Sequence, residues 1–461
     1  MDADDGRRWR GRRLALALLA GALWVVPTVA AHGGALSSAR QDPIEIPFWL
    51  YLVTGGGVVG ASFLLASFLT DRSLLEAIHG WRASIPVPDA VLTWAARLGG
   101  LAGVVVLSLV VLASVFGPRR PTANFAILVV WVGWWAGLVM FVYLVGDVWR
   151  VVDPWRTLGR ALGPRPRVPY PEQLGSWPAV VGVLALVWIE VVSPVSDRPL
   201  LLGVAAVGYT VLTAAGAVAF GAGVWFREAD PIAHVFRFYG RVAPVRRGAN
   251  GFEIALPAAR LTDLDGATGF DDVAFVVAVL WATTYDGLLS TPTWAGLTRW
   301  LVGLGLPPLS VYFATLAVGF ALFLGAYRVA ADASREYATS FLPPARVRAA
   351  FALSLLPIAA GYHLAHFLGY FLTLFPVLLS LLGPISLSPL VLPAWFGALP
   401  IAFVLIGHLL AVGVAHTTAF ELFPHRVQAI RSQYPLVAVM VVYTMVSLWI
   451  VSRPSVPHPF L

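Results

Sequence analysis

Four histidines fall within two long apolar segments near the C-terminal end of the sequence. His363 and His366 lie in GYHLAHF, and His408 and His416 lie in GHLLAVGVAHTTAFE. An ionisable side chain inside a bilayer costs at least about 2–3 kcal/mol unless it is paired or lines a cavity, so such residues mark functional sites. Neutral imidazole is a good ligand for Zn, Cu, Fe and Ni. The two segments therefore predict a transition-metal site, with Zn or Cu as the metal.

The spacing of these histidines determines which of them can share one ion. His363 and His366 are three residues apart, which places both on one face of a helix. His408 and His416 are separated by about 12 Å along a helix axis and cannot bind the same ion. We expect His363, His366 and His408 to meet at one depth, and three His ligands with an open position are typical of catalytic zinc. His416 is then a second site, a proton relay or an interface residue.

Two other interpretations of the histidines stay open. Each imidazole could form a hydrogen bond between helices without binding any ligand. Alternatively, a haem could be held by one His from each segment, although the paired spacing of a two-haem b-type helix is absent.

Two carboxylates and one more histidine extend the predicted site toward the outer side of the membrane. Glu190 lies in VWIEVVSP and Asp286 in TTYDGLLSTP, each near the end of an apolar segment. Together with His32 they could form a mouth above the His cluster, or they could be solvated at helix ends. His32, if it became the N-terminus, would offer an amine and an imidazole together, a chelating pair typical of copper sites.

The composition places these residues in a membrane protein. Of the 461 residues, 59% are hydrophobic and 12% are charged, and the mean hydropathy is +0.79. Soluble domains carry about 25% charged residues. We predict an all-α, polytopic integral membrane helix bundle in the plasma membrane, forming one domain over residues 32–461. Ten stretches approach the length of about 20 apolar residues that crosses a bilayer: 47–69, 95–116, 123–145, 177–194, 200–224, 272–290, 309–331, 348–380, 395–418 and 433–451.

Other totals exclude several classes of site. The chain has no Cys, which excludes disulfides and thiolate metal sites. All 31 basic residues are Arg, which excludes a Schiff-base lysine. The net charge of +7 is expected from Arg in cytoplasmic loops, and we predict no nucleic-acid partner.

The N-terminal residues 1–31 have the form of a secretory signal, with a basic stretch, an apolar core and small residues at the end. Cleavage after Ala31 would expose His32, and an uncleaved signal anchor is the alternative. If residue 32 lies outside, the connections between the ten predicted spans alternate between the two sides of the membrane. Those on the cytoplasmic side, which we call the inward segments, carry 18 Arg, and the outward segments carry six, as the positive-inside rule requires. The mature N-terminus and the C-terminus are therefore expected to be extracytoplasmic.

Two of the inward segments begin alike, with DPWRTLGRALGP from Asp153 and DPIAHVFRFYGRVAP from Asp230. An Asp N-cap followed by Pro predicts a short helix in each case. We expect both helices to be amphipathic and to lie on the membrane surface, with aromatic side chains toward the lipid and Arg toward phosphate. The offset of 77 residues between Asp153 and Asp230 indicates a duplicated two-helix unit.

In these motifs the chain resembles a family of polytopic bacterial membrane proteins that carry the name fenitrothion hydrolase. The resemblance runs through AHGG, DPIEIPFWLYL, GDVWRVVDPWRTLGRAL, TTYDGLLSTPTW, GYHLAHF, GHLLAVGVAHTTA and IRSQYPLVAVMVVYT. It implies hydrolysis of an organophosphate triester. The chain departs from the family pattern at Thr417, where members often have Asp, and at Asp147 and Asp153, which replace Asn.

Three functions are compatible with this sequence. The first is a membrane-embedded hydrolase, in which a His-bound metal activates water, Asp286 or Glu190 is the base, and an apolar substrate enters from the lipid. The second is a transporter of copper or another metal ion, with His32 capturing the ion and His416 receiving it. The third is an accessory subunit that binds partner membrane subunits. Walker A, GxGxxG, GxSxG and HExxH motifs are absent.

Overall fold

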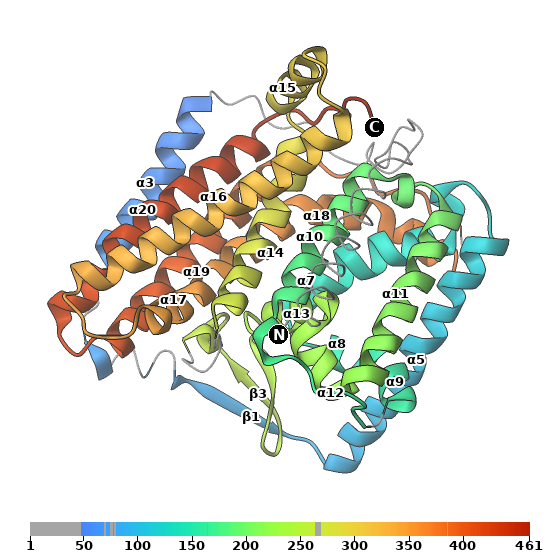
Figure 1. Ribbon diagram of the computed structural model, residues 1–461, viewed down its shortest axis with the longest axis horizontal. Coiled ribbons are helices and arrows are strands. Elements are labelled where there is room, and N and C mark those ends of the chain that lie inside the picture. Colours follow the sequence, from blue (N-terminus) through green and yellow to red (C-terminus); the bar gives the residue numbers. More distant parts are fainter. Residues whose placement is uncertain are drawn as a thin grey trace, which may run out of the picture.

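The computed structural model describes residues 48–461, apart from 69–70, 74–76, 78–79, 164, 263–268 and 385. The predicted signal segment 1–31 and His32 lie outside the described residues. The described part forms a bundle of long helices with a small sheet at one end (Figure 1). The predicted all-α, polytopic membrane bundle is confirmed.

Eight described helical stretches are long and apolar enough to cross a bilayer. Shorter apolar helices occupy the two other predicted spans, at Gly55–Ala66 within α3 (Phe48–Ala66) and at α10 (Trp177–Val192). Each of the ten predicted spans therefore coincides with a helix. The eight long stretches are α5 (Asp89–Phe116), α6–η2–α7 (Phe125–Ile127, Leu128–Leu138, Val139–Leu144), α11 (Pro199–Phe220), α14 (Phe270–Leu289), α16 (Pro308–Tyr337), α17–α18 (Pro344–Ala352, Leu356–Ser380), η8–α19 (Ala394–Ala398, Leu399–Leu422) and α20 (Arg426–Val451).

The outer faces of the long helices are apolar. Leu101 on α5 is 60% exposed, Val204 on α11 is 63% exposed and Leu322 on α16 is 66% exposed. Large apolar side chains exposed along helices of this length are expected to contact lipid. The chain is a multi-pass membrane protein.

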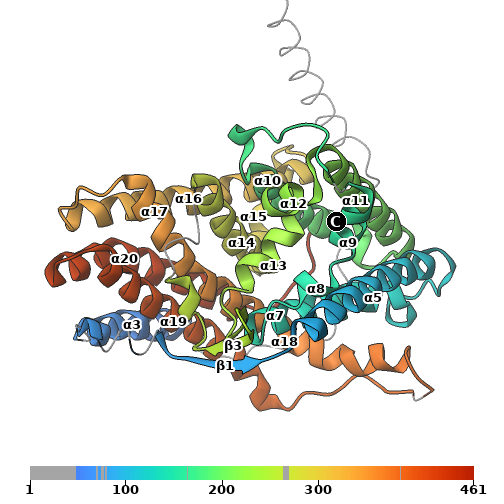
Figure 2. The same cartoon turned by 90° about the horizontal axis from the view of Figure 1, so that it is seen from below.

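Helix α14 runs through the middle of the bundle (Figures 1 and 2). Nearly every residue from Asp272 to Leu289 is buried, and the helix contacts α10, α16 and α18. A helix that is apolar on all sides is expected to be buried in this way. Polar residues on α14 therefore lie inside the protein.

Helices α18 and α19 pack closely because each has a glycine at the crossing point. A Cβ atom on Gly361 would lie 2.6 Å from the Phe403 carbonyl oxygen and 3.0 Å from the Cα atom of Gly407. Small residues allow membrane helices to approach in this way. The close crossing fixes the rotation of α18, and with it the direction of the side chains next to Gly361.

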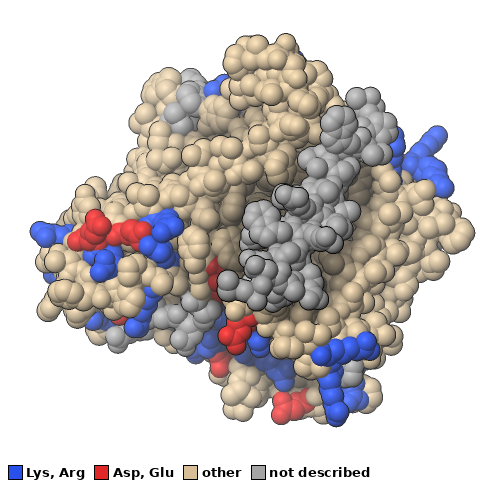
Figure 3. Space-filling view, in the orientation of Figure 1, with Lys and Arg blue, Asp and Glu red and all other residues tan. Residues whose placement is uncertain are grey.

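The segments that were predicted to face one side of the membrane meet at one end of the bundle. Strand β1 (Arg82–Pro86) pairs antiparallel with β3 (Gly251–Ala255), which pairs with β2 (Val245–Gly248). Arg72 donates hydrogen bonds to the carbonyl oxygens of Phe423 and Pro424 at 2.6 and 2.8 Å. We call this end, where β1, α9 (Pro154–Leu162) and α17 lie, the charged end, because Figure 3 shows charged side chains gathered along it.

The two Asp-Pro helices form as predicted. Asp153 accepts a hydrogen bond from the Arg156 amide at 3.0 Å and caps α9, while Asp230 accepts one from the Ala233 amide at 2.8 Å and caps α13 (Pro231–Tyr239). The predicted position on the membrane surface is wrong for α13. Phe236, Phe238 and Tyr239 are at most 2% exposed and pack inside the protein, because α13 lies between other helices and not against lipid.

Helix α15 (Pro292–Gly303) and the C-terminal tail cover the opposite end of the bundle (Figure 1). The Val456 amide donates to the Ser290 carbonyl at 2.9 Å, and the Tyr312 hydroxyl donates to the Pro459 carbonyl at 2.9 Å. The remaining short elements are η1 (Pro121–Ala123), α8 (Trp149–Val152), η3 (Glu172–Leu174), η4 (Pro194–Ser196), α12 (Ala222–Val224), η5 (Trp225–Ala229), η6 (Ala259–Leu261) and η7 (Leu353–Leu355).

Candidate functional site

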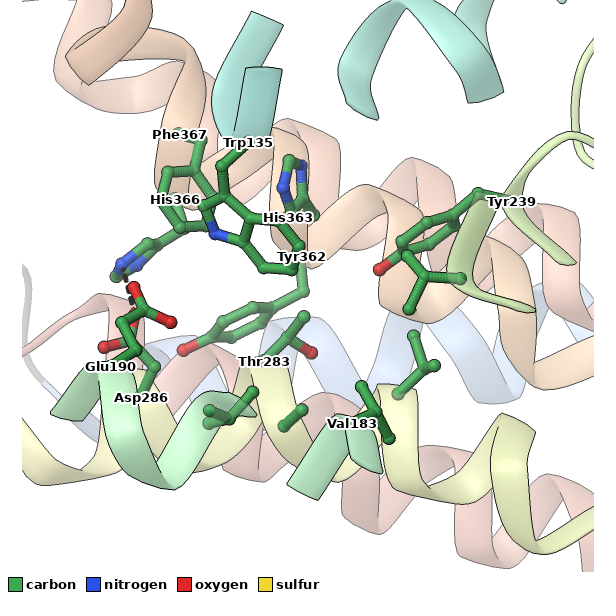
Figure 4. A pocket seen from close by; sticks show the side chains of 14 residues that line it. Trp135, Val183, Glu190, Tyr239, Thr283, Asp286, Tyr362, His363, His366 and Phe367 are labelled. Carbon is green, nitrogen blue, oxygen red and sulfur yellow. Dashed lines mark ion pairs between the residues drawn. The ribbon is translucent and has the colours of Figure 1, made fainter. Parts of the chain in front are cut away.

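The interior of the bundle contains a pocket that we call the His pocket. It is bounded by α10, α14, α18 and η2, with α13 on the side of the charged end. About 30 Å³ of its space is open to the centre of a water molecule, which is enough for one or two waters or an ion. Its polar lining residues are Glu190, Tyr239, Thr283, Asp286, Tyr362, His363 and His366 (Figure 4).

A histidine and a carboxylate from different helices are in contact in this pocket. The Nε2 atom of His366 on α18 lies 2.8 Å from the Oδ2 atom of Asp286 on α14, and both side chains are less than 15% exposed. Glu190 on α10 lies at the same end of the pocket (Figure 4). The structure therefore brings together three of the predicted site residues.

His363 lines the same pocket but has different neighbours. Its Nδ1 atom lies 3.1 Å from the Tyr143 hydroxyl, and its Nε2 atom has no hydrogen-bond partner among the described residues. The rings of Trp135, Tyr143 and Phe367 pack around the imidazole. Trp135 belongs to η2, a π-helix, which is a rare element that is often found at functional sites.

His408 is not among the residues that line the His pocket, so the predicted meeting of three histidines is not observed. It is 1% exposed, and its Nδ1 atom donates to the Val404 carbonyl of its own helix at 2.8 Å. Its Nε2 atom has no hydrogen-bond partner in the described part of the chain. The physical reason is the crossing of Gly361 and Gly407: because Gly361 faces α19, His363, two residues later, points to another side of α18.

His416 connects two helices by a hydrogen bond. Its Nδ1 atom lies 3.1 Å from the Gln433 side-chain oxygen on α20, and the Gln433 amide nitrogen donates to the Ala429 carbonyl at 2.8 Å. Because that amide oxygen is an acceptor, His416 Nδ1 is the donor. This contact is the helix-to-helix hydrogen bond that was the alternative interpretation of the histidines.

Among the described residues, no three His, Asp or Glu side chains are grouped so that they could hold a metal ion. His32 lies outside those residues. The transition metal and the haem stay predictions. The groups closest to such a site are the His366–Asp286 pair and its pocket neighbours His363 and Glu190.

Buried ionisable groups also occur at the N-terminus of α13, outside the spanning helices. Asp230 accepts a hydrogen bond from the Tyr209 hydroxyl at 2.9 Å, and burial raises the pKa of its carboxyl to about 7. His234 Nδ1 lies 2.9 Å from the Asp230 carbonyl oxygen, and burial lowers the pKa of its imidazole to about 3. His234 is therefore neutral at physiological pH.

Several residues of the His pocket were not predicted from the sequence. Tyr143, Trp135 and Tyr239 contact His363, and Thr283 lines the pocket beside Asp286. Tyr143 stands in the apolar run FVYLVGD, where its hydroxyl is the only polar side chain before Asp147. A buried hydroxyl in such a run needs a hydrogen-bond partner, and this requirement could have identified Tyr143 as a site residue from the sequence.

Comparison of the chain with protein-family models, with curated proteins and with solved structures finds no match. The similarity to the fenitrothion hydrolase family therefore stays a resemblance of motifs. The function is inferred from the geometry of the site.

Proposed function

We propose that the protein transports a transition-metal cation, Zn²⁺ or Cu²⁺, and that the His pocket is its binding site. The contact between His366 Nε2 and Asp286 Oδ2 at 2.8 Å inside the bundle carries this proposal. A histidine and a carboxylate are also the ligand types that bind these metals when they are deprotonated. Ionisable residues paired within a membrane are typical of ion pathways.

His363 is the second imidazole that we assign to the metal. Its Nε2 atom is buried in the pocket wall and has no hydrogen-bond partner among the described residues, so that its lone pair could coordinate a metal ion. Binding through Nε2 requires the tautomer in which Nδ1–H donates to the Tyr143 oxygen, 3.1 Å away. Such outer hydrogen bonds fix the ring orientation of metal-binding histidines.

The size of the pocket favours an ion over an organic ester as the occupant. Drug-sized ligands occupy pockets of about 300–1,000 Å³. The His pocket offers about 30 Å³ to a water molecule's centre and is surrounded by aromatic rings. This volume supports transport of a cation more than hydrolysis of the organophosphate triester that the family resemblance implies.

We also propose that the charged end faces the cytoplasm and that the C-terminus is extracytoplasmic. The inward segments carry 18 Arg, against six in the outward segments. In intact cells, a membrane-impermeant thiol reagent should label a single cysteine that replaces Arg299 and should leave one that replaces Arg247 unlabelled. The opposite labelling pattern would reverse the assigned orientation.

The test of the metal site compares two histidines on neighbouring helices, His366 on α18 and His408 on α19. His366→Gln should weaken Zn²⁺ or Cu²⁺ binding by more than the about 10–100-fold that loss of an outer hydrogen bond causes, because it removes a direct ligand. His408→Gln should leave binding unchanged, because His408 does not line the pocket. Tyr143→Phe should weaken binding by about 10–100-fold, as loss of an outer hydrogen bond does.

Affinity is measured by equilibrium dialysis and metal analysis of protein in nanodiscs, and transport by metal uptake into proteoliposomes. The thermal unfolding midpoint of each variant verifies that it is folded. Equal loss of metal in the His366→Gln and His408→Gln proteins, or a wild-type protein that binds and transports no metal, would contradict the proposal.

A further inference from the structure

A second pocket, which we call the Arg pocket, lies at the charged end between the two Asp-Pro helices. Four arginines line it: Arg150, Arg156, Arg227 and Arg237. About 170 Å³ of its space is open to the centre of a water molecule, more than five times the corresponding volume of the His pocket. The other lining residues are Asp147, Trp149, Gly223, Phe226, Ala233 and Phe236.

Six of the ten residues that line the Arg pocket stand at positions related by one offset in the sequence. The offset of 77 residues that relates Asp153 to Asp230 also relates Arg150 to Arg227. It relates two further pairs of lining residues, Trp149 to Phe226 and Arg156 to Ala233. Both copies of the unit therefore present an arginine and an aromatic ring to one shared cavity.

Nearby carboxylates orient the arginines, and in three of four cases the contact is made through Nε. Arg150 approaches Asp147 through Nε at 3.7 Å, Arg156 approaches Asp153 through Nε at 3.4 Å, and Arg227 approaches Glu228 through Nε at 2.6 Å. A guanidinium has five N–H donors, so an Nε contact leaves the two-nitrogen fork for another acceptor.

Aromatic rings further restrict two of these side chains. The Arg156 guanidinium carbon lies 5.3 Å from the Phe226 ring centre, and that of Arg237 lies 4.9 Å from the Phe238 ring centre. Arg237 also contacts Asp272 at 3.5 Å. Side chains fixed in advance lose less entropy when they bind a ligand.

We propose that the Arg pocket binds an anionic phosphate group, carried by a lipid headgroup or by a free phosphate ion. Arg forks match phosphate oxygens geometrically and bind them with charge-assisted hydrogen bonds. Its lining residues Asp147 and Gly223 follow within three residues of the ends of two apolar helices, α7 at Leu144 and α11 at Phe220, and Arg clusters next to the ends of spanning helices attract anionic lipids. This site is separate from the His pocket, because Ala233, Phe236 and Arg237 of α13 line one and Val235 and Tyr239 line the other.

The test uses a double variant of the two equivalent and most exposed arginines. Arg150 and Arg227 have side chains that are 69% and 62% exposed, so their replacement by Gln should leave the fold intact. The matched control is Arg160→Gln, an exposed arginine one turn after Arg156 on α9 that does not line the pocket. Thermal unfolding midpoints verify the folding of all three proteins.

Two probes distinguish the sources of the phosphate group. Inorganic phosphate binding is measured by equilibrium dialysis of protein in phosphatidylcholine nanodiscs, and retained phosphatidylglycerol is counted by native mass spectrometry. We expect the double variant to lose at least tenfold in affinity or occupancy for one of these probes, while Arg160→Gln retains the wild-type value. Loss of phosphate binding alone identifies a free anion, and loss of phosphatidylglycerol identifies a lipid headgroup.

The proposal fails if the wild-type protein binds neither probe more tightly than the double variant does. It also fails if Arg160→Gln lowers binding as much as the double variant, because binding would then follow total charge and not the pocket.

Discussion

The two pockets on either side of α13 differ in where their ionisable groups find partners. In the His pocket the contacts join distant parts of the chain, since His366 pairs with Asp286 and His363 with Tyr143. In the Arg pocket three of four arginines pair with carboxylates one or three residues away in the sequence. The interior pocket is therefore a product of the tertiary fold, while the outer pocket is largely a product of local sequence.

The surroundings of each pocket explain this difference. Within spanning helices no water is present to solvate a polar group, so partners must come from neighbouring helices. At the charged end water competes with every ion pair, and a neighbouring carboxylate orients an arginine without contributing much stability. The contacts of the His pocket depend on the tertiary fold. In the Arg pocket each half is ordered mainly by local contacts, and the fold brings the two halves together.

The largest effect is expected from opening α13, which separates the two pockets. Tyr239 lines the His pocket, and its ring packs against Tyr143 and His363 with centre distances of 5.4 and 6.1 Å. Tyr239→Ala removes this ring and should connect the pockets. Because the chain has no Cys, a single Thr283→Cys substitution in the His pocket reports access cleanly.

We expect an impermeant thiol reagent, added from the charged end, to label Thr283→Cys at least tenfold faster when Tyr239→Ala is also present. The control is Tyr312→Ala, a fully buried tyrosine whose hydroxyl bonds to the C-terminal tail at the opposite end of the bundle. Equal acceleration by both alanine variants would mean that general loosening, and not a barrier at α13, determines access.

The features that follow from short stretches of sequence were predicted correctly. The apolar segments became helices because their length and composition leave no alternative in a bilayer. The N-caps at Asp153 and Asp230 formed because an Asp-Pro pair satisfies the first amide groups of a helix with its own side chain. The arginine-rich segments gather at one end, as the distribution of charge indicated.

The features that depend on helix rotation were not predicted. The expectation that His408 joins His363 and His366 used depth alone, and depth does not say which face of a helix points where. Gly361 and Gly407 set that rotation, and their effect depends on a crossing between segments about 45 residues apart. The same limit applies to α13, whose aromatic side chains could face lipid or protein until its neighbours are known.

A smaller effect is expected from pH, and it concerns the N-terminus of α13 between the two pockets. Burial raises the pKa of the Asp230 carboxyl from 3.8 to about 7 in the folded protein. The folded state therefore holds this proton more tightly than the unfolded state does, and stability from it is complete below about pH 4 and lost as the pH rises through about 7. The thermal unfolding midpoint should therefore decrease as the pH is raised from 5 to 8.

Asp230→Asn should remove much of this fall, because the amide cannot ionise while its oxygen still caps α13 by accepting from the Ala233 amide. We expect the difference between the unfolding midpoints at pH 5 and pH 8 to shrink by about 1 °C for each kcal/mol involved, because the unfolding entropy of a chain of 461 residues is about 1 kcal/mol/K. The midpoints are measured by scanning fluorimetry in detergent. Thr291→Ala, which removes the non-ionisable side-chain cap of α15, should leave the difference between the midpoints unchanged. If the midpoint of the Asp230→Asn protein still decreases by the full amount between pH 5 and pH 8, the N-terminus of α13 is hydrated. The water-free interior that distinguishes the His pocket from the Arg pocket would then begin on the His-pocket side of this helix.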